Sequence, residues 1–451
     1  MSGTQDLLID VKARRAMRKH SARRFFACIG GCILLLCAVF GYLRTSYDGS
    51  KAEIHLSLGS KSPYPQTDLE NNTVPLNMQL VQVQYILRHG ARYPTLGTME
   101  DISEVYELLR DNVPHSWIKD ELVTPSNAAL LVERGRQQTV EIAERMAQRY
   151  PSLIPKSGMR KDAIRFVSSD FQRTVATANE FRHVFDSANQ SAPVTIIPLE
   201  SDTTIAMRFT CPRWTMAKAL VQADISQEQS TFDKLYGKEI RKHISYKLGI
   251  SSAILDVNAI QTIYAMCGYD MSLYGEHNHW CSLFNERIAA LLELRGDIRY
   301  SRVYGSNGAN INNHIACSLF TEIMWEAERA LRDTNRAVSI FRFGHAETIM
   351  FVSNLLKLDQ TLGSVEPPIA GNMSFDDSLR RGFRSSKLIP FSSNLGIELY
   401  KGPSAQGFFR LLLNERVVRL PGCHKDTCPL SDLRRLLATD VGCDYSQMCQ
   451  T

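Results

Sequence analysis

Three short apolar segments along the chain each end in a cluster of polar residues. These segments are Val81–Leu87, Ala163–Ser168 and Val338–Phe343, and their β-branched and aromatic residues are typical of buried strands. Apolar residues at helical spacing occupy 129–150, and a further helix is predicted to start near Asp170. Strands that alternate with helices predict an α/β sheet of mainly parallel character, covered by helices on both faces. The ligand crevice of such a sheet lies beyond the carboxyl ends of its strands.

The stretch between Glu200 and Asp333 has few strand signals, and helical spacing dominates it. Residues 316–331, for instance, place Ala, Leu, Phe and Ile side chains on one helical face. We therefore expect a mainly helical lobe inserted into the α/β domain, and the chain of 451 residues is long enough for both. The organisation predicted after the first 75 residues is an α/β domain over 76–200 and 334–430, a helical lobe over 201–333 and a cysteine-containing C-terminal tail over 431–451.

A different pattern marks the N-terminus, where Phe25–Leu43 provides 19 uncharged and mostly apolar residues. This is about the length that a helix needs to cross roughly 30 Å of hydrocarbon. Residues 1–24 hold seven Lys or Arg against two Asp, so the positive-inside bias predicts a cytoplasmic tail, a transmembrane signal anchor at 25–43 and a stalk over 44–75. The expected topology is single-pass type II, in the secretory pathway or at the cell surface. A cleavable signal peptide, which would leave the protein secreted, is the alternative, and the length of the apolar run favours the anchor.

The net charge of +5 resides in the basic tail, because the rest of the chain carries 45 basic and 45 acidic residues. A formally neutral body argues against the broad basic face that nucleic-acid binding requires. Any anion site must therefore be local. The sequence does not indicate an oligomeric state.

Cysteine usage agrees with an oxidising compartment. Three cysteines lie within the predicted membrane span, and the other eight form an even set that is consistent with up to four disulfides. Proximity along the chain suggests the pairs Cys267–Cys281 and Cys423–Cys428, while the remaining connectivity does not follow from the sequence. Three sequons are candidate glycosylation sites on the same side of the membrane: Asn71, Asn189 and Asn372.

The first predicted strand ends in the run Arg88-His89-Gly90-Ala91-Arg92-Tyr93-Pro94. Two guanidiniums beside one imidazole disfavour imidazolium, which keeps His89 neutral and nucleophilic, and they can hold a phosphate dianion. The glycine lets the backbone approach a ligand closely. This run resembles the signature of the histidine acid phosphatases, a branch of the phosphoglycerate-mutase-like fold that forms a phosphohistidine intermediate. The resemblance implies that His89 is the nucleophile and that Arg88 and Arg92 bind phosphate.

The second cluster, residues 168–174 (SSDFQRT), is similar to the family's strand-to-helix turn, which implies that Arg173 is a third phosphate-binding arginine. The third cluster has His345-Ala346-Glu347 where most family members have His-Asp. This form resembles the multiple inositol polyphosphate phosphatases. The resemblance implies that His345 contacts the phosphoryl oxygens and that Glu347 is the general acid, a role that needs a raised pKa in the substrate complex. A first-turn carboxylate that interacts with the helix dipole is the alternative for Glu347.

Further matches to the family extend over most of residues 80–430, and we interpret them as scaffold. They are Arg134–Gln138 on the early helix, Pro390–Asn394 before a late strand, and Asn414-Glu415 before Pro421-Gly422-Cys423. Of these residues, Asn394 could approach the site. His277 and His279, close to Cys281, lack the spacing of recognised zinc ligands, so we expect no metal.

The leading hypothesis is hydrolysis of phosphomonoesters on a highly phosphorylated small molecule, such as inositol hexakisphosphate, with bisphosphoglycerate as a further substrate. We expect the enzyme to need no cofactor. We expect it to contact the membrane only through residues 25–43. A broad-specificity acid phosphatase is the nearest alternative, differing in its substrate pocket. An inactive relative that serves as a binding module is a third reading, which the retention of every expected charged group disfavours.

Overall fold

The computed structural model describes residues 57–65, 74–151, 163–185, 193–275, 279–332, 337–358 and 369–450. These residues belong to one compact unit, Ile54–Thr451. The predicted tail, the predicted membrane anchor and most of the predicted stalk lie outside the described residues, as do the sequons at Asn71 and Asn189. None of the helices in the described ranges combines the length and the apolar character needed to cross a bilayer.

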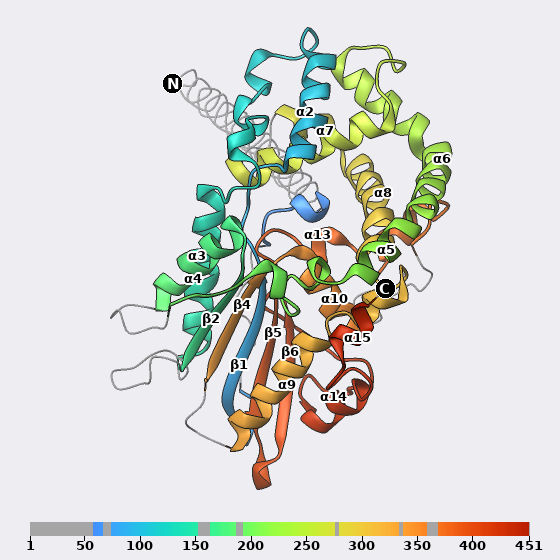
Figure 1. Cartoon of the computed structure of the whole chain (residues 1–451). Coiled ribbons are helices and arrows are strands. Elements are labelled where there is room, and N and C mark those ends of the chain that lie inside the picture. The colour runs from blue at the N-terminus through green and yellow to red at the C-terminus, as the bar shows by residue number, and fades with distance from the viewer. Residues whose placement is uncertain are drawn as a thin grey trace, which may run out of the picture. The chain divides into compact units, whose positions relative to one another are not determined.

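Within the described residues, eight strands form one mixed sheet in the order β3-β2-β4-β1-β5-β6-β7, with β8 beside β6 (Figure 1). The strands are β1 Gln79–Arg88, β2 Ile164–Ser169, β3 Thr195–Ile197, β4 Ser339–Gly344, β5 Asn394–Lys401, β6 Gly407–Leu413, β7 Arg416–Val418 and β8 Cys428–Pro429. Strands β1 to β4 pair parallel with one another, whereas β5 to β8 pair antiparallel. The three strands predicted from the sequence are confirmed as β1, β2 and β4.

The expectation of a mainly parallel sheet is corrected by its C-terminal half. Strands β6 and β7 are joined by only Asn414 and Glu415, which have φ values of 50° and 65°. Two consecutive residues with positive φ make the tight turn of a β-hairpin, and a hairpin can only connect antiparallel strands. The short connection from β5 to β6 has the same consequence.

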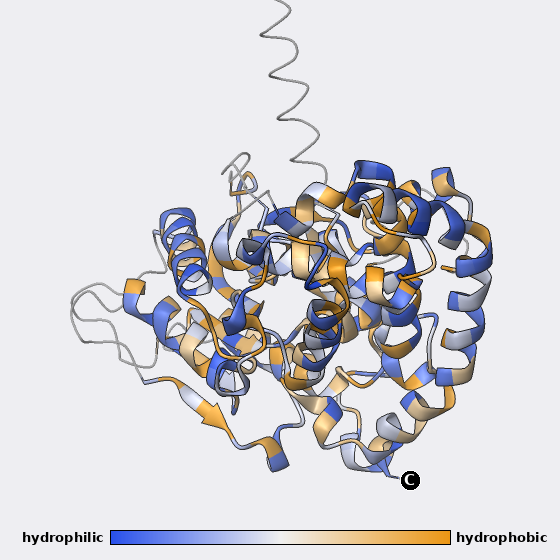
Figure 2. Ribbon diagram, turned by 90° about the horizontal axis from the view of Figure 1, so that it is seen from above, coloured by the Kyte–Doolittle hydropathy of each residue, from blue (hydrophilic) through white to orange (hydrophobic). Residues whose placement is uncertain are grey.

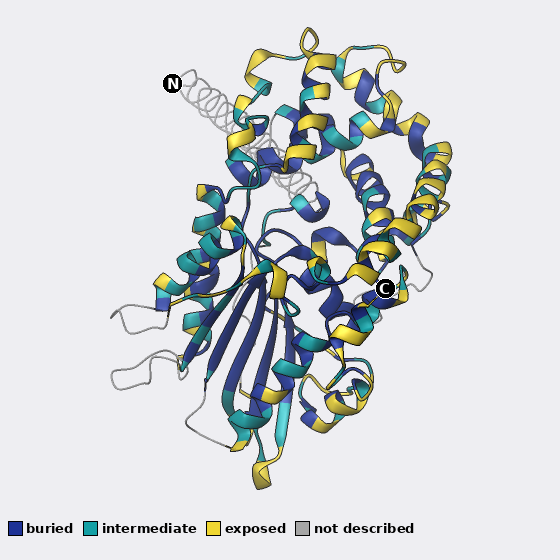
Figure 3. Ribbon diagram, in the orientation of Figure 1, coloured by how far each residue is buried: buried dark blue, intermediate teal, exposed yellow. Residues whose placement is uncertain are grey.

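Helices cover both faces of the sheet, as the sequence predicted. Helices α3 Glu133–Arg149 and α4 Gln172–Phe185 pack on the face to which β1 contributes Val83, Tyr85 and Leu87. Helices α9 Cys317–Arg332 and α10 Ala346–Leu355 pack on the other face, over Ile86. Figure 3 shows the central strands buried along most of their length between these two layers. Coverage on both faces also explains why the polar residues of these strands, such as Gln82, Gln84 and Arg342, are buried along with the apolar ones.

A helical lobe lies above the carboxyl ends of the parallel strands in Figure 1. Its helices are α2 Leu96–Leu109, α5 Pro212–Leu220, α6 Gln222–Leu248, α7 Val257–Tyr269 and α8 Glu286–Tyr304. The core of the lobe contains Phe232, Trp280 and Leu291, while α6, at the right edge of Figure 2, carries mostly hydrophilic residues. Two helices fall outside the division expected from the sequence. Helix α2 packs on α7 in the lobe, and α9 packs on β1 of the sheet.

Four disulfides link the eight cysteines of the described region. The pairs expected from proximity, Cys267–Cys281 and Cys423–Cys428, are both present. The other two disulfides tie the C-terminal segment to distant parts of the chain, and they are Cys211–Cys449 and Cys317–Cys443. The segment 431–451, expected only as a tail, thus includes a helix, α15 Tyr445–Cys449, that packs on α5.

Candidate active site

The predicted site residues meet at the carboxyl edge of the parallel strands. The ends of β1 and β4 are in register through Arg88 and Gly344, and β2 lies on the other side of β4. The next residue on each of these two strands is a histidine, and the rings of His89 and His345 lie 5.8 Å apart between centroids. Arg173, at the start of α4, reaches the same point and contacts His345. The structure therefore brings together side chains that the sequence placed in three separate clusters.

His89 is held as a neutral imidazole with one free ring nitrogen. Its Nδ1 lies 2.9 Å from the carbonyl oxygen of Gly90. Because a carbonyl can only accept a hydrogen bond, Nδ1 carries the proton and Nε2 keeps its lone pair. Burial lowers the pKa of His89 well below its ordinary value, and the positive charges of Arg173, Arg88 and Arg92 lower it further. The neutral form expected from the sequence is explained by burial first and by the arginines second.

The segment Pro390–Asn394 braces the backbone around His89. The N–H of Ser392 donates to the carbonyl of His89, and the N–H of Arg88 donates to the carbonyl of Ser393. Asn394 donates through Nδ2 to the hydroxyl of Tyr64 at 2.9 Å. Asn394 thus has a scaffold contact, and the segment fixes the nucleophile from behind.

Two glycines allow helix α3 to pack against the loop that carries His89. A Cβ on Gly90 would lie 2.5 Å from the carbonyl oxygen of Gly135, and a Cβ on Gly135 would lie 2.7 Å from the backbone nitrogen of Ala91. Both distances are far below van der Waals contact. The Arg134–Gln138 match in the sequence therefore has a steric reason, since a side chain at its glycine would displace the loop.

Replacing Gly135 with alanine is expected to lower both stability and activity. The clash should cost about 1–3 kcal/mol of unfolding free energy, and a shift of the loop by roughly 1 Å should lower turnover by about 10²-fold. Gly97, in α2, is the matched control, because a Cβ there meets no atom within 4 Å. Chemical denaturation and steady-state kinetics of Gly135→Ala and Gly97→Ala test this. Equal behaviour of the two variants would contradict the steric argument.

Three arginines surround His89, and each has a hydrogen-bond donor without a partner among the described residues. Arg88 donates from Nη1 to the carbonyls of Ser60 and Ile389, at 2.7 and 2.5 Å. Burial lowers the pKa of Arg88 to about 10, and it lowers that of Arg173 to the same value, so both remain cations at neutral pH. The Nε atoms of Arg88, Arg92 and Arg173 are buried and have no hydrogen-bond partner among the described residues. Buried cationic donors without partners are suited to an anion such as phosphate.

His345 is oriented by two polar neighbours. Its Nδ1 accepts a hydrogen bond from Nη2 of Arg173 at 3.3 Å, because a guanidinium can only donate. Its Nε2 therefore carries the proton and donates to Oγ of Ser169 at 3.2 Å. Burial lowers the pKa of His345 to about 3, so its ring is neutral. The neutral ring of His345 can therefore lie against an anion beside His89 without exchanging a proton with that anion.

Glu347, in the first turn of α10, is paired with an arginine that the sequence analysis missed. Nε of Arg208, in the short helix η6 Met207–Phe209, donates to Oε1 of Glu347 at 2.6 Å. Burial raises the pKa of Glu347, but the charge of Arg208 and the hydrogen bond that it donates outweigh burial and lower the pKa to about 2. Arg208 lies in the lobe region and belongs to no recognisable motif. Only its position in the folded chain reveals it.

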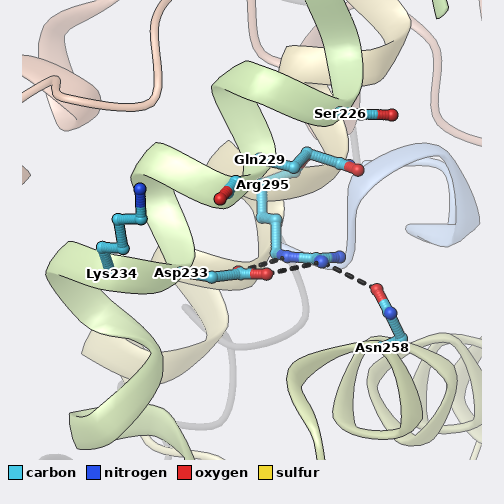
Figure 4. A pocket seen from close by; sticks show the side chains of 7 residues that line it. Ser226, Gln229, Asp233, Lys234, Asn258 and Arg295 are labelled. Atoms are coloured by element: carbon cyan, nitrogen blue, oxygen red, sulfur yellow. Dashed lines mark hydrogen bonds and ion pairs between the residues drawn. The ribbon is translucent and has the colours of Figure 1, made fainter. Parts of the chain in front are cut away.

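A separate hollow of about 450 Å³ lies between α6, α7 and α8 of the lobe (Figure 4). Within it, Arg295 donates to both carboxylate oxygens of Asp233 and to Oδ1 of Asn258. The charge of Arg295 is compensated by these contacts, which indicates a structural role. The hollow contains none of the predicted site residues.

No group of three or more His, Cys, Asp or Glu side chains in the described ranges is arranged to hold a metal ion. Cys281 is bonded to Cys267, as expected, and His277 lies outside the described residues.

A family model described as the histidine phosphatase superfamily (branch 2) matches residues 79–414, about three quarters of the chain. The chain belongs to this superfamily. Among curated proteins of known sequence, the chicken (Gallus gallus) multiple inositol polyphosphate phosphatase 1 is 26% identical to this branch 2 histidine phosphatase, and the match covers 91% of this chain and 92% of the relative.

Solved structures show the same fold. The phytase from D. castellii superposes with a TM-score of 0.72 at 16% sequence identity, over 88% of this chain and 87% of that one. A multiple inositol polyphosphate phosphatase from Bifidobacterium longum, solved in complex with inositol hexasulfate, superposes with a TM-score of 0.67 at 16% identity, over 85% and 98% of the two chains. At this level of identity the likeness establishes the architecture of the branch 2 histidine phosphatase.

Proposed function

We propose that this histidine phosphatase hydrolyses phosphomonoesters of inositol polyphosphates, such as inositol hexakisphosphate, through a phosphohistidine intermediate. The observation that carries the proposal is the neutral His89, whose free Nε2 lies among three arginines with buried, unpaired Nε donors. The substrate class is suggested by the chicken relative and by the ligand of the Bifidobacterium longum structure, a sulfate analogue of a polyphosphorylated ring.

The reaction proceeds in two steps. Nε2 of His89 attacks phosphorus and forms a P–N bond while the P–O bond to the inositol breaks, and Glu347 donates its proton to the departing oxygen. Arg88, Arg92 and Arg173 hold the transferring phosphoryl group and stabilise its charge, with His345 against its oxygens. Water then attacks phosphorus and gives its proton to Glu347, which frees phosphate and regenerates neutral His89.

The surroundings of Arg88 favour a substrate with several phosphates. The Ser60 carbonyl that accepts from Arg88 belongs to a residue that lines a cavity of about 410 Å³, and Lys61, Arg299 and Tyr300 line the same cavity. Two cations there can face phosphates that are not being cleaved. Asp101 and Glu293 also line this cavity, so it is mixed in charge, and it is the two cations near Arg88 that support the polyphosphate hypothesis over a pocket for simple monoesters.

A ranking of substrates tests the proposed function. We expect kcat/KM on inositol hexakisphosphate to exceed that on bisphosphoglycerate and, by a larger margin, that on a simple alkyl phosphate. Comparable turnover of all three would instead support a broad-specificity acid phosphatase. Absence of turnover on every phosphomonoester would support a binding module.

Replacing Glu347 with glutamine tests the proton donor. Loss of the general acid should lower kcat on inositol hexakisphosphate by about 10²–10⁴-fold, because an alkoxide is a poor leaving group. Hydrolysis of p-nitrophenyl phosphate should fall far less, since p-nitrophenolate leaves without a proton. Steady-state rates of both reactions on the wild type and Glu347→Gln provide the comparison. An equal loss on both substrates would assign Glu347 a different role.

We also propose that residues 25–43 anchor the enzyme with its phosphatase domain lumenal or extracellular. The four disulfides of the described region support an oxidising environment on that side. The full-length chain should remain in the membrane pellet after alkaline carbonate extraction, with its domain protected from protease in sealed microsomes. Release of the chain into the supernatant would favour the cleaved signal peptide.

A further inference from the structure

We propose that Arg208 acts as a gate on the general acid. The ion pair with Arg208 keeps Glu347 ionised, and a second phosphate of the substrate draws Arg208 away so that Glu347 can be protonated. The inference rests on the proposed function, since it concerns how the proton donor of that reaction is activated. It makes Arg208 a positioning residue that couples cleavage of one phosphate to the presence of another. The enzyme would then discriminate between polyphosphates and monophosphates in the chemical step as well as in binding.

The ion pair between Arg208 and Glu347 is short and largely shielded from water. The two side chains meet at 2.6 Å, with 24% of the arginine and 16% of the carboxylate side chain exposed. The charged and titratable groups that face Glu347 come from the lobe, from the strand ends and from the start of α4. They are Arg208, Tyr304, His345, Arg88 and Arg173. Arg208 is the strongest of those that favour the ionised carboxylate.

This pairing conflicts with the chemistry that Glu347 has to perform. A general acid must carry a proton when the leaving oxygen departs, yet the pKa of Glu347 is lowered to about 2 while Arg208 is in contact with it. At mildly acidic or neutral pH, almost every molecule in this arrangement would hold a carboxylate. The contact must therefore be broken, or its charge compensated, before the first step.

Arg208 can leave without any change of the backbone. Its segment is held by the hydrogen bond from Oγ1 of Thr210 to the carbonyl of Asp202, at 3.1 Å, and by the disulfide at Cys211. The guanidinium lies over the ring of Phe209 at 3.7 Å, an aromatic surface on which it can turn. Rotation of one side chain is enough to open the gate.

Bound substrate can compete with Glu347 for the guanidinium of Arg208. The charge of Arg208 acts on both Arg173 and His345. Arg208 therefore lies beside the cradle, which is the set of three arginines (Arg88, Arg92 and Arg173) that holds the scissile phosphate. A neighbouring phosphate carries up to two negative charges and three acceptor oxygens, and it competes for the guanidinium better than one carboxylate does. The scissile phosphate compensates the three cradle arginines at the same time. Both effects raise the pKa of Glu347 and favour its protonated form.

The test compares a polyphosphate with an alkyl monophosphate in Arg208→Gln. On glycerol 2-phosphate, which has no second phosphate, kcat/KM should rise by about tenfold or more near pH 5–6, because one unit in the pKa of the acid changes its protonated fraction about tenfold. On inositol hexakisphosphate, kcat/KM should fall by about tenfold from the lost contact. The basic limb of the pH profile on glycerol 2-phosphate should move to higher pH.

Two further variants keep the result interpretable. The gain on glycerol 2-phosphate must vanish when Arg208→Gln is combined with Glu347→Gln, because the gain acts through that carboxyl group. Arg213→Gln, at an exposed arginine in α5 that donates to the carbonyl of Met448, is the matched control and should leave both activities unchanged.

A similar loss of kcat/KM on both substrates in Arg208→Gln would contradict the proposed gate and would assign Arg208 the role of a simple phosphate ligand or structural residue. Unchanged kinetics on both substrates would overturn it as well. Failure of the proposed function has a different signature, since the wild-type enzyme would then hydrolyse neither inositol hexakisphosphate nor p-nitrophenyl phosphate.

Discussion

Replacing His89 with alanine is expected to lower turnover of inositol hexakisphosphate by roughly 10⁴-fold or more. The variant lacks the Nε2 lone pair that we propose attacks phosphorus, and no other described side chain holds a free imidazole nitrogen at the centre of the three arginines. Wild-type enzyme mixed with substrate and quenched in alkali should yield a phosphohistidine, because phosphoramidates survive base. The variant should yield none.

A matched histidine separates chemistry from folding in this experiment. His183 lies exposed on α4, away from the cradle, so His183→Ala should keep wild-type activity. Both variants should unfold cooperatively in a thermal melt, which shows that each is folded. Substantial hydrolysis by folded His89→Ala would contradict the phosphohistidine mechanism itself.

Replacing Glu293 with alanine is expected to cost about 3–5 kcal/mol of unfolding free energy, because it leaves buried arginines without their counter-charge. Glu293, in α8, is 1% exposed and accepts from Nε of Arg384 at 3.0 Å and from the N–H of Ser386 at 3.1 Å. Arg381 lies 3.6 Å from the same carboxylate. These contacts attach the lobe to the segment 381–389, whose Ile389 carbonyl holds Arg88.

Exposed Glu239, which pairs with Arg287 at 2.7 Å, is the control. Glu239→Ala should cost less than about 1 kcal/mol in denaturant unfolding. The cost of Glu293→Ala should also shrink in acid. Burial raises the pKa of Glu293, but Arg381 and Arg384 outweigh it and lower the pKa in the folded state. The contribution of Glu293 is therefore present above the pKa of the unfolded chain and is lost as the pH falls through the folded value. Equal losses at the two positions, or a cost that grows in acid, would contradict this account.

The predicted site residues that the structure brings together share a local origin. Arg88, His89 and Arg92 lie in one run at the end of β1, and His345 and Glu347 follow β4 in the same way. A buried strand can be recognised from its own composition, and parallel strands bring their carboxyl ends to one edge. The neutral state of His89 followed as well, because charge and burial both act against imidazolium.

The predictions that needed correction concern contacts between distant segments. The antiparallel half of the sheet depends on short hairpins, whose residues Asn414 and Glu415 had been noticed only as scaffold. Helix α9 shows the apolar face predicted for it, but a one-sided apolar face does not reveal whether it covers a sheet or another helix. The same limit applies to α2.

The sequence by itself indicated the family and the class of reaction and predicted His89 as the nucleophile, because these are carried by contiguous runs whose chemistry is readable residue by residue. Only the tertiary structure decided what surrounds the acid. Arg208 reaches Glu347 across 139 residues of chain, and Cys211 and Cys317 find partners near the C-terminus. Such pairings depend on how the lobe packs on the sheet, which no local pattern of hydrophobic and polar residues encodes. The run around His89 therefore indicates the chemistry, whereas the contact between Arg208 of η6 and Glu347 of α10 is visible only in the folded chain.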